Sequence, residues 1–282
     1  MYKRQLEDDV PEVRIRAAKS LGMVGGVASA VPLIAALKEP NRWSTIRVAD
    51  ILSEIGHPVT QELIEAFPDL AVPARLAALD ILGRIRPLES APWLRDRLHD
   101  PERDVRARAA HALGSIGEPG SGPALAAALD DADWPVRAMA AKALGRVHWQ
   151  AAIPELSRSL RDPEWWVRAN AAEALRALGN PGQVALDRML EDSDRYARHQ
   201  AVLMMQESGE LDRRVENLAS YEPDEVTRAK AWLARVCRAG QDGRLREIAE
   251  RHRNAEVRRR LDVLLADEQA RRAAAAPAGG AA

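Results

Sequence analysis

The chain has 282 residues, with 41 Lys and Arg against 42 Asp and Glu, so its formal net charge is -1. A balanced charge provides no overall field that would attract nucleic acid or an anionic membrane. The single cysteine, Cys237, excludes a disulfide framework and a cysteine-rich metal site. No run of 18 apolar residues predicts a transmembrane helix.

The chain begins with MYKRQ, which matches the translation of a common sequencing-library adaptor. We therefore interpret residues 1–5 as a non-native scar rather than as part of the fold. The natural N-terminus, with any leader or membrane anchor that it carries, is then expected to be missing from this sequence.

From residue 6 to residue 268 a short phrase recurs nine times, most clearly as DPERDVRARAAHALGSIG, DADWPVRAMAAKALGRV and DPEWWVRANAAEALRALG. The Arg of its Val-Arg pair serves as a register mark, and successive marks lie 30 or 31 residues apart. A fixed period of this size predicts a solenoid of stacked helical hairpins. The marks are Arg14, Thr45, Arg75, Arg106, Arg137, Arg168, Arg198, Arg228 and Arg258.

Each copy predicts two helices. Apolar residues at -12 and -8 from the mark share one face of a first helix, and an acid at -6 is predicted to end it and to cap the second helix. The second helix carries small residues at +3 and +4 and a large apolar residue at +7. Glycines are predicted to relieve crowding at +8 and to supply a left-handed helix end at +11. They are Gly22, Gly83, Gly114 and Gly145 at +8, and Gly25, Gly56, Gly117, Gly179 and Gly209 at +11.

The last copies depart from this pattern. Ser220 and Glu250 replace the apolar residue at -8, and Arg235 occupies a +7 position. We expect either a polar cap or a slip of register there. Residues 269–282, which contain no large apolar side chain, are predicted to form a frayed helix end and a flexible tail.

The consensus DPxxVRxxAAxALGxxG resembles HEAT repeats of the short bacterial type, the phycobilisome lyase HEAT-like repeats. The resemblance implies an all-α fold, an α-solenoid of about nine hairpins wound as a right-handed superhelix, with the second helices on the concave face. It also implies that the acid at -6 and the arginine at 0 form a structural ladder along the array. The ladder residues are Asp100, Arg106, Asp131, Arg137, Asp162 and Arg168.

A binding surface is predicted on the second helices, where positions -2, +2, +5 and +9 form one mostly polar stripe. Large aromatic residues at -2 and -3 are typical anchors of protein interfaces, although they could instead pack locally over the turn. Because adjacent helical residues diverge by roughly 100°, at least one of Trp165 and Trp166 should be exposed. The candidate partner-binding residues are Trp43, Arg47, Arg108, Trp134, Trp165, Trp166, Asn170 and Tyr196.

The sequence contains no recognisable catalytic motif. Its six histidines form no pair with metal-ligand spacing, and it has no phosphate-binding glycine loop, GxSxG or HExxH. The paired His-Glu motifs with which deoxyhypusine hydroxylase, an enzyme on this repeat fold, holds iron are absent. We therefore predict a non-enzymatic scaffold that binds another protein on its concave face, as a monomer without metal or cofactor.

Three alternatives stay open. The run from Pro163 to Arg198 is similar to bacterial HEAT proteins that carry an N-terminal anchor and accompany glycosyltransferases. The repeats also resemble phycobilisome lyase subunits, which implies an accessory role with a bilin and its acceptor protein. The third alternative is nucleic-acid binding through the +2 arginines, against which the neighbouring acids argue. The expected location is the cytoplasm, or the cytoplasmic face of the inner membrane if an anchor is missing.

Overall fold

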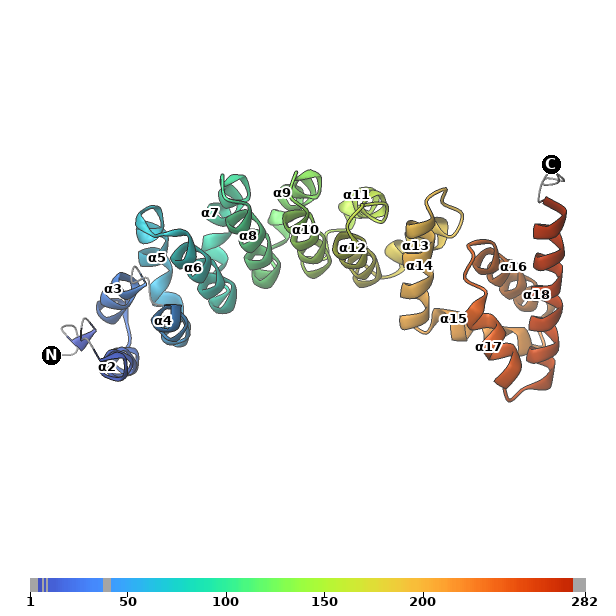
Figure 1. Ribbon diagram of the computed structural model, residues 1–282, viewed down its shortest axis with the longest axis horizontal. Coiled ribbons are helices and arrows are strands. Elements are labelled where there is room, and N and C mark those ends of the chain that lie inside the picture. Colours follow the sequence, from blue (N-terminus) through green and yellow to red (C-terminus); the bar gives the residue numbers. More distant parts are fainter. Residues whose placement is uncertain (1–4, 7, 9, 38–41, 276–282) are drawn as a thin grey trace, which may run out of the picture. The chain divides into compact units, whose positions relative to one another are not determined.

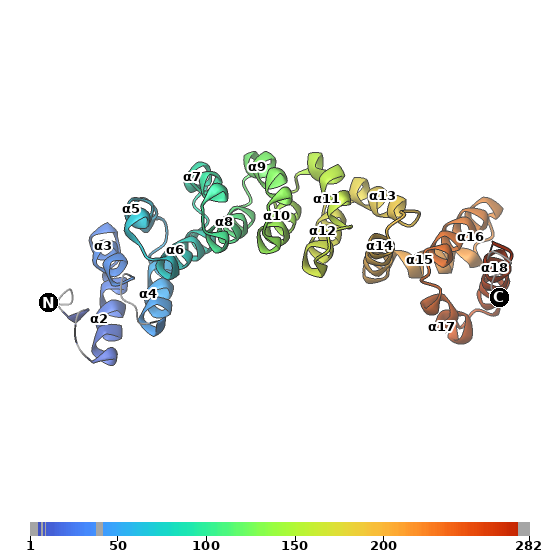
Figure 2. The ribbon, with the colours of Figure 1, turned by 45° about the horizontal axis from the view of Figure 1, so that its top comes forward.

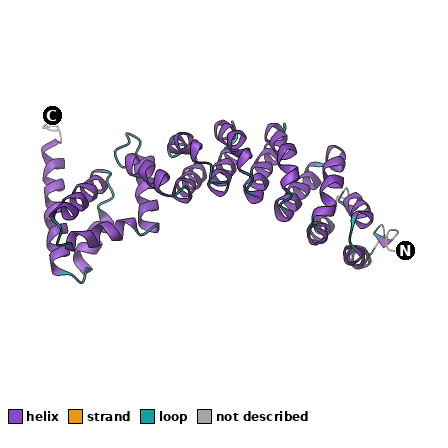
Figure 3. Ribbon diagram, turned by 180° about the vertical axis from the view of Figure 1, so that it is seen from behind, coloured by secondary structure: helices purple, strands orange, loops and turns teal. Residues whose placement is uncertain are grey.

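The computed structural model describes residues 5–6, 8, 10–37 and 42–275, and all regular structure in these ranges is helical (Figure 3). The predicted fold class, an all-α solenoid, is confirmed. The chain divides into two compact units, Met1–Leu156 and Ser157–Ala282. Residues 1–4 of the predicted scar and residues 276–282 of the predicted tail lie outside the described ranges.

In the first unit the two helices of each hairpin lie in two rows (Figures 1 and 2). The second helices are α2 (Pro11–Val24), α4 (Arg42–Ile55), α6 (Val72–Ile85), α8 (Arg103–Ile116) and α10 (Trp134–Arg146). The first helices are α3 (Val27–Ala36), α5 (Thr60–Ala66), α7 (Ala91–Asp96) and α9 (Gly122–Ala127). Short 3-10 turns flank the last three, at His57–Val59, Phe67–Asp69, Leu88–Ser90, Arg97–His99, Pro119–Ser121 and Ala128–Asp130.

In the second unit the second helices are α12 (Trp165–Ala177), α14 (Arg195–Glu207), α16 (Pro223–Arg238) and α18 (Ala255–Ala275). The first helices are α13 (Asn180–Met189), α15 (Glu210–Glu216) and α17 (Gly243–Arg251), with a 3-10 turn at Asn217–Ala219 after α15. A 3-10 turn at Gln150–Ala152 leads into α11 (Ile153–Ser159), which contains the boundary between the units. Because α18 runs to Ala275, residues 269–275 of the predicted tail are helical.

The predicted leucine positions form the core. The -12 leucines Leu33, Leu94 and Leu125 and the +7 leucines Leu82 and Leu113 are fully buried. Neighbouring second helices also pack directly on one another, as α6 does on α8 and α8 on α10. Because these helices are short, the stacking of neighbours stabilises each of them.

The register arginine fixes the turn between the two helices of its own hairpin. In α8, Nη1 of Arg106 donates to the carbonyl of Asp100 at 2.8 Å and to that of Pro101 at 3.2 Å. The carboxylate of Asp100 accepts the backbone N–H of Glu102 at 2.9 Å. Within a hairpin, therefore, the arginine binds the carbonyl of the acidic residue rather than its carboxylate.

The same arginine also joins one hairpin to the next. Arg106 donates through Nε and Nη2 to the carboxylate of Asp131, at 2.8 and 3.1 Å, and through Nη2 to Asp133 at 2.9 Å. Burial opposes ionisation of Asp131, but its hydrogen bonds from Arg106 and the backbone of Asp133 outweigh burial and lower its pKa. The next two ladder residues make the same bonds within their own hairpins. Arg137 donates to the carbonyl of Asp131, and the carboxylate of Asp162 accepts the backbone N–H of Glu164. Arg137 and Asp162 belong to different units.

The ladder changes in the second unit. Asp192 accepts Nε of Arg161 at 3.0 Å, and Arg161 lies at the end of the preceding first helix rather than at a register mark. Arg168 keeps its bonds to the carbonyls of Asp162, at 2.7 Å, and Pro163, at 2.8 Å. Its guanidinium then lies over an aromatic ring of α14 instead of pairing with a carboxylate.

Crowding at +8 is confirmed for Gly22, Gly83 and Gly114, and positive φ at +11 is confirmed for all five predicted glycines. A Cβ on Gly114 would lie 2.7 Å from the Cα of Ala143, so α8 and α10 touch backbone to backbone at the +8 position. At +11, Gly25, Gly56, Gly117, Gly179 and Gly209 all have positive φ. Two copies place other residues there, Arg86 with φ of 59° and His148 with φ of 52°.

The expected irregularity near the C-terminus is a slip of one residue. In α16 the buried side chains include Trp232, Leu233 and Val236 at +4, +5 and +8, one position later than in the earlier copies. The left-handed glycine moves with them, because Ala239 is helical and Gly240 has φ of 81°. Arg228, the register mark, is exposed and makes no hydrogen bond or ion pair within the described ranges.

Candidate partner-binding surface

In the first unit, exposed positions of neighbouring second helices are linked by ion pairs. Nη1 of Arg84 on α6 lies 2.7 Å from Oδ1 of Asp50 on α4. Nη1 of Arg108 on α8 lies 2.8 Å from Oδ1 of Asp80 on α6. Because these side chains stay solvated, each pair contributes about 0–1 kcal/mol of stability. These pairs join +2, +5 and +9 side chains of α4, α6 and α8 into a polar surface, which Ala77 interrupts at the +2 position of α6.

His111 lies in this surface, half-buried on α8. Burial is the main cause that lowers its pKa, and the charges of Arg146, Arg108 and Lys142 act in the same direction against that of Asp80. Its imidazole is therefore neutral at pH 7. Arg146 on α10 donates through Nη1 to the hydroxyl of Ser115 at 3.3 Å. The +9 members Arg84 and Arg146 were absent from the predicted residues, although their spacing from the mark would have found them.

The other candidates of the first unit are separate from these pairs. Arg47 is exposed on α4 and borders a small hollow with Leu6, Ile15 and Val48. Trp134, the first residue of α10, is 40% exposed. The side chain of Trp43 lies outside the part of the chain whose side chains are described.

The second unit carries an exposed aromatic group at the start of two second helices. Trp165 and Trp166 begin α12 and are 50% and 57% exposed, so both rings reach solvent. The rings meet edge to face, with centroids 4.7 Å apart and planes at 77°. This geometry is favourable between aromatic rings. With Tyr196, at the start of α14, these two residues form what we call the aromatic platform.

The ring of Tyr196 contacts two guanidinium groups. The Arg168 guanidinium carbon lies 4.7 Å from the ring centre and that of Arg195 lies 4.6 Å from it. Arg195 donates through Nη2 to the Tyr196 hydroxyl at 2.6 Å, and this bond is the main cause that lowers the pKa of Tyr196. Arg168 is itself buried and anchored on turn carbonyls. The ring is therefore fixed before any partner arrives.

Arg168 was predicted as a ladder residue, and its contact with Tyr196 was not predicted. The arginine is part of the regular repeat, so only the aromatic residue at -2 in the next copy distinguishes it. Asn170, one turn after Trp166, is partly exposed beside the platform. Gln200, at the same +2 position on α14, is buried, so the polar stripe is interrupted on that helix.

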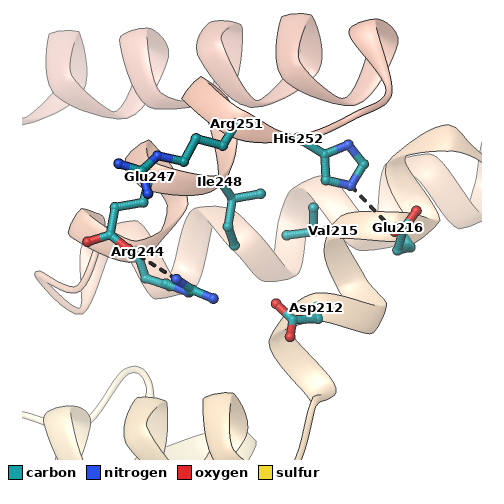
Figure 4. A pocket seen from close by; sticks show the side chains of 8 residues that line it. All are labelled: Asp212, Val215, Glu216, Arg244, Glu247, Ile248, Arg251 and His252. Atoms are coloured by element: carbon teal, nitrogen blue, oxygen red, sulfur yellow. Dashed lines mark hydrogen bonds and ion pairs between the residues drawn. The ribbon is translucent and has the colours of Figure 1, made fainter.

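A groove of about 480 Å³ lies between α15 and α17 (Figure 4). Two contacts join polar side chains within it: Arg244 lies 3.1 Å from Glu247, and Nε2 of His252 lies 3.4 Å from Glu216. Nδ1 of His252 accepts the backbone N–H of Asn254 at 3.1 Å. His252 stands at -6, so it replaces the capping aspartate of the other copies. In this groove His252 therefore caps the start of the following helix. The side chains that line the groove do not converge on one point as ligand-binding groups would.

The described residues contain neither a cluster of metal-ligating side chains nor a membrane-spanning helix. Within these ranges, no group of three or more His, Cys, Asp or Glu side chains is arranged to hold a metal ion. None of the described helices combines the length and the apolar character needed to cross a bilayer. Burial raises the pKa of Cys237 to about 11, which keeps the thiol protonated at neutral pH.

The repeats match known family models. The model described as HEAT repeats matches residues 60–134 and 122–206, which together span more than half of the chain. The model described as PBS lyase HEAT-like repeat matches residues 13–39. No curated protein matches the chain.

Several solved structures are similar to the chain. An engineered protein is 18% identical, with a TM-score of 0.42 over 95% of this chain and 87% of that one. Human deoxyhypusine hydroxylase in complex with glycerol is 19% identical, with a TM-score of 0.34 over 73% and 93%. The complex of CpcE and CpcF of phycocyanin lyase from Nostoc sp. PCC7120 is 25% identical, with a TM-score of 0.43 over 52% and 97%.

Proposed function

The chain belongs to the HEAT-repeat family, and from this premise we propose that it is a non-enzymatic scaffold that binds another protein through the exposed surface of its second helices. The observation that carries the proposal is the aromatic platform. Trp165, Trp166 and Tyr196 expose 50%, 57% and 44% of their surface. Trp, Tyr and Arg are the residues that dominate the energetics of protein interfaces.

The platform is preorganised for binding. Tyr196 is clamped by Arg168 and Arg195, and the two tryptophan rings rest on each other. Ordering a side chain on binding costs about 0.5–1.5 kcal/mol, and a ring that is already held avoids part of this cost. Covering these rings would remove apolar surface from water, which favours association.

The paired charges of the first unit favour a protein partner over nucleic acid. Arg84 and Arg108 lie in ion pairs with Asp50 and Asp80. A phosphate backbone would have to compete with these carboxylates, and their negative charge would repel it. A protein surface that carries both positive and negative charges can complement these second helices without breaking their ion pairs.

The test has two steps. A photo-crosslinking amino acid at Asn170, beside the platform, identifies a partner in the native host, and the purified partner is then titrated against the chain. Trp165→Ala with Trp166→Ala is expected to weaken that binding about ten-fold or more, as hot-spot tryptophans do. The matched control is Leu88→Ala, which removes an apolar side chain that is 62% exposed in the first unit.

Hydrogen exchange of α12 and α14 in the double variant shows whether the helices remain folded. If the folded double variant binds the partner as tightly as the unmodified chain, the platform is not the binding site. If Leu88→Ala weakens binding equally, the effect is not specific to the platform.

A further inference from the structure

An open groove runs between α16 and α18, the last two second helices. It consists of two hollows of about 490 and 370 Å³ that share Lys230, Arg260 and Val263. The two hollows adjoin at these shared residues along the seam between α16 and α18, and together they are called the groove. The earlier pair α8 and α10 has no room for such a groove at its crossing, where a Cβ on Gly114 would already meet Ala143.

The groove has an apolar floor. Val226, Ala231 and Ala234 line it from α16, and Val263 and Leu264 line it from α18. Val263 is 55% exposed and Ala231 is exposed. Ala231 and Ala234 are three residues apart, so they are neighbours on the surface of α16.

The rim of the groove is positively charged. Five cationic side chains line it against three acidic ones, an excess of two positive charges in a chain whose net charge is -1. The cations are Lys230, Arg238, Arg259, Arg260 and Arg271, and the acids are Glu256, Asp267 and Glu268.

Two of the three acids, Glu256 and Glu268, form ion pairs with cations of the same groove. Glu256 lies 2.9 Å from Arg259 and 2.5 Å from Arg260. Glu268 lies 3.0 Å from Arg271. Lys230 is exposed and makes no hydrogen bond or ion pair in the described part of the chain. Its ammonium group is thus available to a negatively charged ligand.

We propose that this groove binds an acidic amphipathic helix of a partner protein. A ligand helix would place apolar residues at i, i+3 and i+4 on the floor formed by Val226 and Val263, and carboxylates beside Lys230 and Arg259. The 16 residues of α16 span about 24 Å, which accommodates a helix of about 10–15 residues. The groove is a second binding site, distinct from the aromatic platform, and the proposal stands on its own residues.

The experiment uses the full chain and two synthetic peptides of about 15 residues with the same leucine pattern, one with glutamates and one with lysines at the polar positions. Fluorescence anisotropy is expected to show the acidic peptide binding at least about ten-fold more tightly than the basic one. Raised salt is expected to reduce this preference, because the rim charges are exposed.

Two substitutions on α18 add the same negative charge on different faces. Val263→Glu, in the groove, is expected to weaken binding of the acidic peptide about ten-fold. Gln269→Glu is the matched control, because Gln269 faces α17 among Asp262 and Leu265, and it is expected to change the affinity less than about two-fold.

The proposal is overturned if both peptides bind equally, or if Val263→Glu and Gln269→Glu have the same effect. Sedimentation that shows a dimer dissociated by Val263→Glu would assign the groove to a second copy of the chain instead. Tighter peptide binding after removal of residues 276–282 would assign it to the chain's own C-terminal segment. The Trp165→Ala, Trp166→Ala variant is expected to retain peptide binding, which separates this test from that of the platform.

Discussion

The pair α8–α10 and the pair α16–α18 are built from the same repeat and differ in how closely their helices approach. Gly114 lets α8 touch α10 at the backbone. Neither α16 nor α18 contains a glycine, and the long side chains of Arg238 and Arg260 lie in the space between them. In the first pair a glycine lets the helices touch, so no groove separates them. In the second pair arginines line the space between the helices, and a groove is present.

The register arginine differs between the same regions. Arg106 binds two turn carbonyls of its own hairpin and the carboxylates of Asp131 and Asp133 in the next. Arg228 makes no such bond in the described ranges, because the one-residue slip of α16 turns it to solvent. The register arginine therefore links two hairpins in one copy, where we call it a clamp, and is a solvent-exposed surface residue in another.

The largest expected effect comes from removing this clamp. Arg106→Met is expected to lower the free energy of unfolding by about 2–4 kcal/mol, because Asp131 is left without its charged partner in a partly buried site. Arg228→Met, the matched control at the same repeat position, is expected to change it by less than about 0.5 kcal/mol. Urea unfolding with hydrogen exchange of α8 and α10 measures both.

Acidification provides an independent check of this clamp. The pKa of Asp131 is lowered in the folded chain, so its contribution is present above the pKa of the unfolded state and is lost as the pH falls through the folded value. The stability gap between the unmodified chain and Arg106→Met should therefore narrow as the pH falls from 7 toward 3. A gap that stays constant would contradict the role of the Asp131 carboxylate.

Adding a side chain at the close contact between α8 and α10 is expected to have the next largest effect. Gly114→Ala is expected to destabilise the first unit by about 1–3 kcal/mol, because the added Cβ lies 2.7 Å from the backbone of Ala143 and the helices must move apart. Gly243→Ala, at the start of α17, meets no atom within 4 Å and is expected to be neutral or stabilising by up to about 1 kcal/mol. Equal effects of the two substitutions would show that helix propensity, not the close approach, decides the result.

The sequence predicts the features that every hairpin shares. It does not predict contacts that depend on which side chain the neighbouring hairpin presents. The buried leucines, the crowded glycines Gly22, Gly83 and Gly114 at +8 and the positive φ at +11 follow from position within a hairpin, and these predictions are confirmed. The contact of Arg168 with Tyr196 depends on which side chain the next copy presents, and the repeat pattern does not carry that information.

The groove between α16 and α18 was missed for a related reason. The replacements at Ser220, Arg235 and Glu250 indicated an irregularity, but they did not show whether it would close or open the surface. The outcome depends on Trp232, which moves into the core one position late, and on Arg235, whose guanidinium lies 2.9 Å from Glu191. A single-residue slip changes which side chains face the neighbouring helix, and this follows only from the packed structure.

The smallest expected effect concerns the +11 position, where the regular copies use glycine. Arg86 and His148 are exposed there with φ of 59° and 52°, a conformation that costs a residue with a side chain roughly 1–2 kcal/mol. Glycine removes this cost but gains freedom in the unfolded chain, which offsets about 0.4–1 kcal/mol of it. Arg86→Gly and His148→Gly are therefore each expected to stabilise the chain by about 0.5–1 kcal/mol, measured by urea unfolding. Lys142→Gly, in the interior of α10, should instead destabilise it by about 1 kcal/mol, and a gain at that position would show that the benefit is not due to the left-handed conformation.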